Sequence, residues 1–207
     1  MSERHPTVPR EAVRNIASGV FFMAFFSLMW SSWGTGSLNG LGKWLPWVIV
    51  YFVFIVLLAG AIVLMRRARH LNRATHEQMR EWSGTGKWFG RIFAAEGVLV
   101  VISVAVCVVT HRPDLIAPAV SLVVGLHFFP LARIFHLKLY YWTGAVICLV
   151  AFIGFFLVPD TVILGGYEVQ ARPAFVGLST ALILWFIGGY ILGIGIKMLK
   201  INDHGSV

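Results

Sequence analysis

Six apolar runs divide the chain, and short polar segments separate them. The runs extend from Ile16 to Trp33, Leu45 to Met65, Ile92 to Val109, Leu115 to Leu131, Tyr140 to Val158 and Ala174 to Met198. Each is long enough to cross about 30 Å of hydrocarbon as a helix. The pattern predicts an all-α integral membrane bundle of six transmembrane helices. Similar residues at the starts of the odd-numbered runs favour an arrangement as three tandem helical hairpins.

The composition agrees with this prediction. Apolar residues make up 58% of the 207 residues and the mean hydropathy is +0.80. Such a chain has too little polar surface to cover a water-soluble globule, so the lipid bilayer is its expected solvent. No polar segment is long enough to fold as a separate domain. We therefore expect a single transmembrane domain over residues 1–207.

The basic residues predict the orientation in the membrane. With the N-terminus inside, fourteen of the 17 Lys and Arg residues fall on the inner side, and Lys43, Arg112 and Arg172 fall on the outer side. Positive residues near membrane helices tend to stay in the cytoplasm. We expect a multi-pass protein of the cell (inner or plasma) membrane with both termini cytoplasmic. The net charge of +8 is then a topology signal, and no nucleic-acid partner is expected.

Residues 66–91 form the longest polar segment, which we interpret as a basic cytoplasmic loop. Its less polar residues recur at helical spacing between the basic ones, so the segment is expected to lie on the cytoplasmic leaflet and contact anionic lipid. Ser83 to Gly86 are expected to end this helix before the third span. An alternative interpretation is a docking arm for a partner.

The first run is also compared with a secretory signal, because Arg4, Arg10 and Arg14 precede it. No small-x-small cleavage site follows it, and the bulky Trp33 stands near the place where a small residue is needed. We expect this span to remain in the mature chain.

Two ionisable residues lie at membrane depth, where charge is costly and often functional. Glu96 is near the inner start of the third run, and His127 is near the inner end of the fourth. Because consecutive spans run antiparallel, the two side chains are predicted to lie at similar depth and to meet. Pro130 cannot donate a hydrogen bond to the Leu126 carbonyl, so a helix kink is predicted beside His127.

Other polar residues at a similar depth extend this prediction to a polar pocket open to the cytoplasm. The further pocket candidates are Asn15, Ser18, Ser103, Tyr141, Thr143 and Tyr190. In the alternative interpretation, Glu96 reaches water or pairs with Arg91 or Arg133, and His127 satisfies a neighbouring backbone group.

Glycines in the sixth run predict close helix packing. Gly189 and Gly193 form a G-x-x-x-G pattern, with Gly188 and Gly195 beside it. Such positions let another backbone approach closely, either inside the bundle or in a homo-oligomer.

The segment GLHFFPLARIFHLKLYYWTGA, from Gly125 to Ala145, resembles a signature of small uncharacterised bacterial multi-pass membrane proteins. These proteins are grouped as a domain of unknown function and contain a G-L-H-F-x-P-L-A segment. The resemblance implies a membrane protein without an assigned activity. It singles out Gly125, His127, Pro130, Tyr140, Tyr141 and Gly144.

Several functional classes fit these observations. A small transporter or permease is favoured by the six spans and by Glu96 and His127 as a protonation site. A membrane scaffold or accessory subunit fits nearly as well. A haem-b or quinone redox subunit needs two axial imidazoles on facing helices, and only His127 is well placed. A membrane enzyme would use Glu96 and His127 as base and acid, but no catalytic motif accompanies them. We assign no catalytic residue and expect no metal and no cofactor.

Overall fold

Six α-helices and one β-hairpin form the fold in the computed structural model, which describes residues 8–42 and 44–204. The helices are α1 (Arg10–Gly36), α2 (Leu45–Ala68), α3 (His76–Val109), α4 (Ile116–Phe135), α5 (Lys138–Phe156) and α6 (Ala171–His204), with a short 3-10 helix, η1 (Pro113–Leu115), before α4. All six α-helices of the described residues contain a segment long and apolar enough to cross a membrane. The predicted all-α bundle is confirmed, and the protein is a multi-pass membrane protein.

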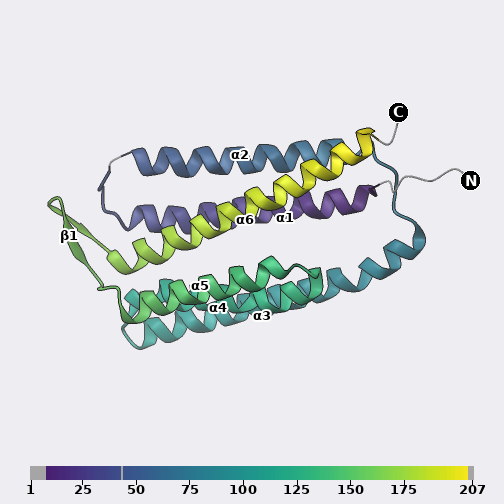
Figure 1. The fold of residues 1–207 in the computed structure, drawn as a ribbon. Coiled ribbons are helices and arrows are strands. Elements are labelled where there is room, and N and C mark those ends of the chain that lie inside the picture. Colours follow the sequence, from purple (N-terminus) through teal and green to yellow (C-terminus); the bar gives the residue numbers. More distant parts are fainter. Residues whose placement is uncertain (1–7, 43, 205–207) are drawn as a thin grey trace, which may run out of the picture.

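The helices form two groups of three. One group contains α1, α2 and α6, and the other contains α3, α4 and α5 (Figure 1). The groups meet where α6 packs against α4 and α5, and also where Phe22 and Phe26 of α1 contact Phe89 and Phe93 of α3. This grouping differs from three tandem hairpins, because the most extensive partner of α1 is α6 and that of α4 is α5.

Two glycine crossings explain this grouping. A Cβ on Gly177 of α6 would lie 2.7 Å from the Gly34 nitrogen of α1. A Cβ on Gly144 of α5 would lie 2.7 Å from the Gly125 oxygen of α4. At both crossings the backbones approach more closely than any side chain permits, which is the usual way small residues join membrane helices.

The glycines of the predicted G-x-x-x-G pattern have different surroundings. Gly188 packs against Met23 and Leu57, and Gly195 packs against Leu64. For Gly189 and Gly193, an added Cβ would meet nothing within 4 Å. The expected in-bundle packing therefore applies to the flanking glycines and not to the G-x-x-x-G pair. That pair lies on a helix face that no described residue covers within this distance.

The two ends of the bundle differ in their connections. At one end, called here the terminal end, α1 begins, α6 ends and residues 69–75 join α2 to α3 (Figure 1). At the other, the hairpin end, a β-hairpin lies between α5 and α6. Toward the terminal end α6 runs away from α5 and ends beside α2 (Figure 1). Helix α6 therefore leaves the α3–α4–α5 group toward the terminal end (Figure 1), whereas α1 stays in contact with α3 through Phe22, Phe26, Phe89 and Phe93.

The hairpin was not expected from the hydropathy pattern. Strands β1 (Val162–Leu164) and β2 (Tyr167–Val169) pair antiparallel, and Gly165 and Gly166 form the turn with φ of +57° and +82°. Two positive φ values are what a two-residue hairpin turn requires, and glycine adopts them without strain. The Gly-Gly pair between two short β-rich runs was the available signal.

Helix α3 corrects the expected boundary of the third span. The break predicted at Ser83 to Gly86 is wrong, because α3 is continuous through these residues. Glycine and serine lower helix propensity by at most about 1 kcal/mol each, and without a proline an established helix continues through them. Within the segment interpreted as the basic loop, only residues 69–75 lie outside helices. This connection is held on the first turn of α1, where Ala74 donates to Glu11 over 2.8 Å.

Candidate functional site

The structure places Glu96 and His127 in contact. Glu96 Oε1 on α3 lies 3.2 Å from His127 Nδ1 on α4, and their side chains are 10% and 15% exposed. His127 Nδ1 makes no well-aligned hydrogen bond among the described residues. The contact is therefore an electrostatic one at ion-pair distance, and not a fixed hydrogen bond.

The contact lies inside the span and closer to the terminal end. His127 precedes the end of α4 at Phe135 by eight residues, or about 12 Å of helix. Glu96 precedes the end of α3 at Val109 by thirteen residues, or about 20 Å. At such a depth an isolated charge costs at least about 2.5–3.5 kcal/mol. Each residue thus provides the other with a polar partner that lipid does not offer.

An aromatic ring lies beside His127, and further rings pack nearby. The Phe128 ring centroid lies 4.6 Å from that of His127, and Tyr140 packs edge-on against Phe128 at 5.6 Å. On α3, Phe93 lies three residues before Glu96, and its ring centroid is 6.2 Å from that of Phe22 on α1. These apolar neighbours keep the local dielectric low, so the charge states of Glu96 and His127 depend strongly on each other.

The other predicted site residues are not gathered around this contact. Thr143 is buried but donates to the Leu139 carbonyl over 3.0 Å, so its own helix satisfies it. Ser18 and Ser103 are half-buried, whereas Asn15, Tyr141 and Tyr190 are exposed. Among the described residues, none of these six makes a hydrogen bond or ion pair with Glu96 or His127. The candidate site therefore rests on the Glu96–His127 contact.

Pro130 lies within α4, which is continuous from Ile116 to Phe135. It has no N–H to donate, so the Leu126 carbonyl has no donor from Pro130. This places a backbone acceptor one residue before His127. The kink remains a prediction.

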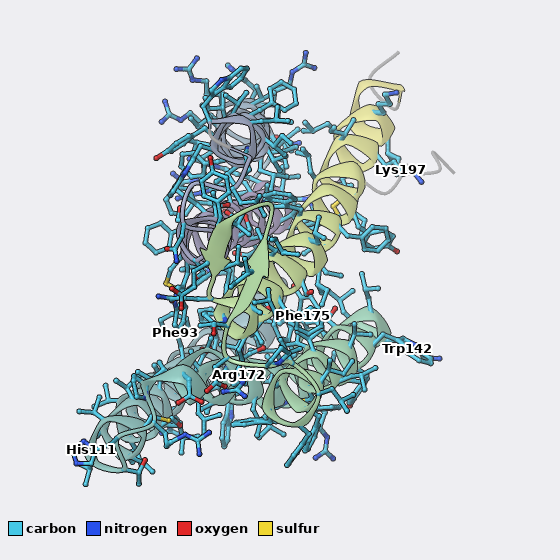
Figure 2. All side chains as sticks on the ribbon, turned by 90° about the vertical axis from the view of Figure 1, so that its left-hand side faces the viewer. Phe93, His111, Trp142, Arg172, Phe175 and Lys197 are labelled. Atoms are coloured by element: carbon cyan, nitrogen blue, oxygen red, sulfur yellow. The ribbon has the colours of Figure 1, made fainter. Side chains whose placement is uncertain are left out.

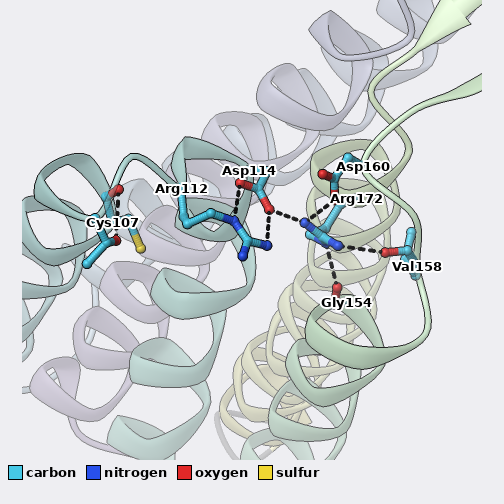
Figure 3. A network of polar contacts seen from close by, with 8 residues as sticks. Cys107, Arg112, Asp114, Gly154, Val158, Asp160 and Arg172 are labelled. Atoms are coloured by element: carbon cyan, nitrogen blue, oxygen red, sulfur yellow. Dashed lines mark hydrogen bonds and ion pairs between the residues drawn. The ribbon is translucent and has the colours of Figure 1, made fainter.

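An arginine at the hairpin end forms a second polar cluster (Figure 3). Arg172, near the start of α6, is 8% exposed and pairs with Asp114 of η1 and with Asp160 through Nη1. Its Nε donates to the Gly154 carbonyl over 2.9 Å, and its Nη2 donates to the Val158 carbonyl over 3.1 Å. Viewed from the hairpin end, Arg172 lies between the start of α6 and the α3–α4–α5 group (Figure 2).

Asp114 is shared between two arginines. Besides Arg172, it accepts two hydrogen bonds of 3.1 Å from Arg112, one from Nε and one from Nη2. These hydrogen bonds, together with the negative charge of Asp114, raise the pKa of Arg112. From the sequence, Arg112 and Arg172 are predicted only as outer charges. The missed signal was the presence of Asp114 and Asp160 in the polar segments of the same side.

A third polar contact lies deeper between the two helix groups. Ser121 of α4 and Thr180 of α6 are both fully buried, and their side-chain oxygens are 3.3 Å apart. A hydroxyl pair of this kind satisfies two polar groups where the helices meet. Serine and threonine are common in membrane helices, so nothing in the sequence singles out these two.

The histidines of the described residues are spread over several parts of the fold. His70 and His76 are near the connection from α2 to α3, while His111 and His136 follow the ends of α3 and α4. Within the described ranges, His127 is the one histidine inside an apolar span, and its Nδ1 faces a carboxylate. Two axial imidazoles on facing helices are therefore not present there. The described residues also contain no group of three potential metal ligands.

Comparison with known proteins gives one match. Residues 89–187 match the model of a family of unknown function (DUF7010). The match contains Gly125 to Ala145, as well as Glu96, Asp114 and Arg172. No curated protein and no solved structure matches the chain. The expected similarity to a domain of unknown function is thus confirmed, and the family description assigns no activity.

Proposed function

We propose that the protein is a small proton-linked transporter whose protonation site is the Glu96–His127 pair. The observation that carries this proposal is the 3.2 Å contact between the two side chains inside a membrane span. Ionisable residues within membrane bundles commonly mark proton and ion pathways. The imidazole of histidine changes charge more readily near neutral pH than other side chains do.

The pair has two net-neutral arrangements that differ only in the position of one proton. In one, Glu96 is ionised and His127 is protonated; in the other, both are uncharged. Adding or removing a proton leaves a net charge among apolar neighbours, which is costly without a compensating ion or water. A charged or polar substrate entering beside the pair would therefore change its proton occupancy. This is the coupling that a proton-linked transporter needs.

The arrangement of the helices supports access from the terminal end. Helix α6 leaves α5 toward the terminal end (Figure 1), and the Glu96–His127 pair lies closer to that end. Relative movement of two helix groups around a site near the bilayer centre is how many transporters alternate access. The proposed pocket is accordingly open to the cytoplasm, and Glu96 and His127 form its polar wall.

Transport can be tested with the purified protein in lipid vesicles that contain a pH-sensitive dye. A panel of small metabolites and inorganic cations is added outside, and compound-dependent proton movement is recorded. We expect at least one compound to move protons with the wild-type protein, and Glu96→Gln to abolish that movement. Ser103→Ala is the matched control, because Ser103 lies on the same stripe of α3. Undiminished proton movement in Glu96→Gln would contradict the proposal.

The orientation belongs to the same proposal: a cell membrane with both termini cytoplasmic. All the described basic side chains except Arg112 and Arg172 lie toward the terminal end, where they would face the cytoplasm and its anionic lipids. They are Arg10, Arg14, Arg66, Arg67, Arg69, Arg73, Lys87, Arg91, Arg133, Lys138, Lys197 and Lys200. The detergent-solubilised protein is mixed with lipid vesicles that contain or lack anionic lipid. Vesicle flotation then tests whether the protein prefers anionic lipid.

A second candidate function is that of an accessory subunit or homo-oligomer. The open face at Gly189 and Gly193 favours it, because a second helix could approach there without displacing any side chain. Counting subunits in bilayers by single-molecule photobleaching tests this directly. We expect Gly193→Ile to reduce the oligomer and Leu182→Ile, elsewhere on α6, to leave it unchanged. A wild-type protein that is monomeric throughout would rule out this candidate.

A further inference from the structure

Arg172 connects three helix ends at the hairpin end. It belongs to the first turn of α6, while Asp114 directly precedes α4 and Gly154 lies in the last turn of α5. The last carbonyls of a helix lack intrahelical donors and carry partial negative charge, so they favour a cation. A single buried guanidinium therefore holds the start of one helix group against the ends of two helices of the other.

The interface below Arg172 is closed. Val176 of α6 packs against Gly154 and Thr180 contacts Ser121, and the side chains of Val176, Thr180 and Ser121 are fully buried. Beyond this level, α6 moves away from α5 toward the terminal end (Figure 1). The Arg172 cluster thus lies where α6 joins the α3–α4–α5 group, and any separation of α6 from that group on the hairpin side must separate its members.

The acidic partners of Arg172 are arranged so that this separation leaves neither of them unpaired in lipid. Asp114 keeps its two hydrogen bonds from Arg112, which is 53% exposed. Asp160 is 58% exposed and can be solvated by water. Most of the cost of opening therefore falls on Arg172 and on the carbonyls of Gly154 and Val158. Because both acids keep a partner or water when they separate from Arg172, the separation costs less than it would for acids left unpaired in lipid, and the contact can form and break reversibly.

We propose that Arg172, Asp114 and Asp160 form a latch that closes the hairpin side of the bundle, with Arg112 as the residue that holds Asp114 when the latch opens. The proposal rests on the transport function proposed above, since it assigns the closed outer gate of that site. In the structure the latch is shut, and α6 moves away from α5 toward the opposite side (Figure 1).

The test measures access to Thr180 from the hairpin side. Thr180→Cys is introduced into a Cys107→Ala, Cys148→Ala background, and its reaction with a membrane-impermeant maleimide is followed in sealed vesicles of known orientation. Thr180 is fully buried, about 12 Å of helix beyond Arg172. Ile163→Cys, at the exposed hairpin, is the positive control for reagent access. No substrate and no pH gradient is applied, so the result does not depend on transport.

With the latch intact, we expect slow labelling at position 180. Arg172→Gln should raise the labelling rate about tenfold or more, because removing one partner of a buried ion pair strongly favours the separated state. Arg112→Gln is the matched control: it removes the alternative partner of Asp114 and should leave labelling unchanged or slower. Asp160→Asn should raise the labelling rate less than Arg172→Gln does. It provides a second test of the latch if the Arg172→Gln protein does not fold.

Two results would overturn the latch. One is an unchanged labelling rate in folded Arg172→Gln or Asp160→Asn protein, and the other is an equal rise in Arg112→Gln. A rise confined to the latch variants, in a protein that shows no proton-linked transport, would keep the latch and reject the transport function. The two proposals can therefore fail separately.

Discussion

Glu96 Oε1 and His127 Nδ1 lie 3.2 Å apart, although 31 positions separate the two residues in the chain. The turn between α3 and α4 explains the contact, because two antiparallel helices bring residues at equal distances from their connection to the same depth. The carboxylate and the imidazole thereby meet inside the apolar span, where each is the polar partner of the other.

The first prediction concerns the energetic coupling of this pair. Glu96→Gln and His127→Ala should each lower the thermal midpoint of the protein in detergent. Because each single variant already removes the contact, the double variant should cost less than the sum of the two by about 0.5–2 kcal/mol. The measurement is a double-mutant cycle on thermal unfolding. Strictly additive effects would mean that the two side chains are stabilised independently.

The second prediction separates glycines that pack from glycines that do not. Gly177→Ala places a Cβ 2.7 Å from the Gly34 nitrogen and should destabilise the protein by about 1–3 kcal/mol through overpacking. Gly189→Ala places a Cβ in open space and should leave the stability of the monomer unchanged or slightly higher. Thermal unfolding of the two variants in detergent compares them directly. Equal losses would contradict the α1–α6 crossing described here.

The third prediction concerns topology. Reporter fusions after the end of α6 and in the connection at residues 69–75 should both read cytoplasmic, and a reporter inserted at Gly165 should read extracytoplasmic. The reason is the clustering of basic residues at the terminal end. If the fusion after α6 and the Gly165 insertion report the same side, the six-span arrangement is wrong.

The parts of the fold that follow from hydropathy were predictable from the sequence. The six spans and their approximate bounds depend on runs of apolar residues. Such runs are placed in the bilayer by their own hydrophobicity and length, whichever helices they pack against. The depth of Glu96 and His127 also followed, because helix geometry fixes the rise per residue. The end of the basic segment was not predictable from the sequence in this way. Ser83 to Gly86 each have a low helix propensity, but helix propagation along α3 outweighs these local preferences.

The partners of each helix were not predictable from local pattern. Gly189 and Gly193 match a packing motif and lie open, whereas Gly34 and Gly177 form a close crossing outside any G-x-x-x-G motif. Which glycine meets which backbone depends on the rotation of two helices that are far apart in the chain. The same limit applies to Arg172, whose partners lie up to 58 positions away and come from three different segments.

The central claim is that the Glu96–His127 pair takes up and releases a proton inside the membrane, and infrared difference spectroscopy of the protein in bilayers tests it most directly. On a change of pH, the wild-type protein should show a carboxylic-acid carbonyl band that is lost in Glu96→Gln, shifted in His127→Ala and retained in Ser103→Ala. If the spectra of the wild-type protein and Glu96→Gln are the same, Glu96 does not change its protonation state and the claim is contradicted.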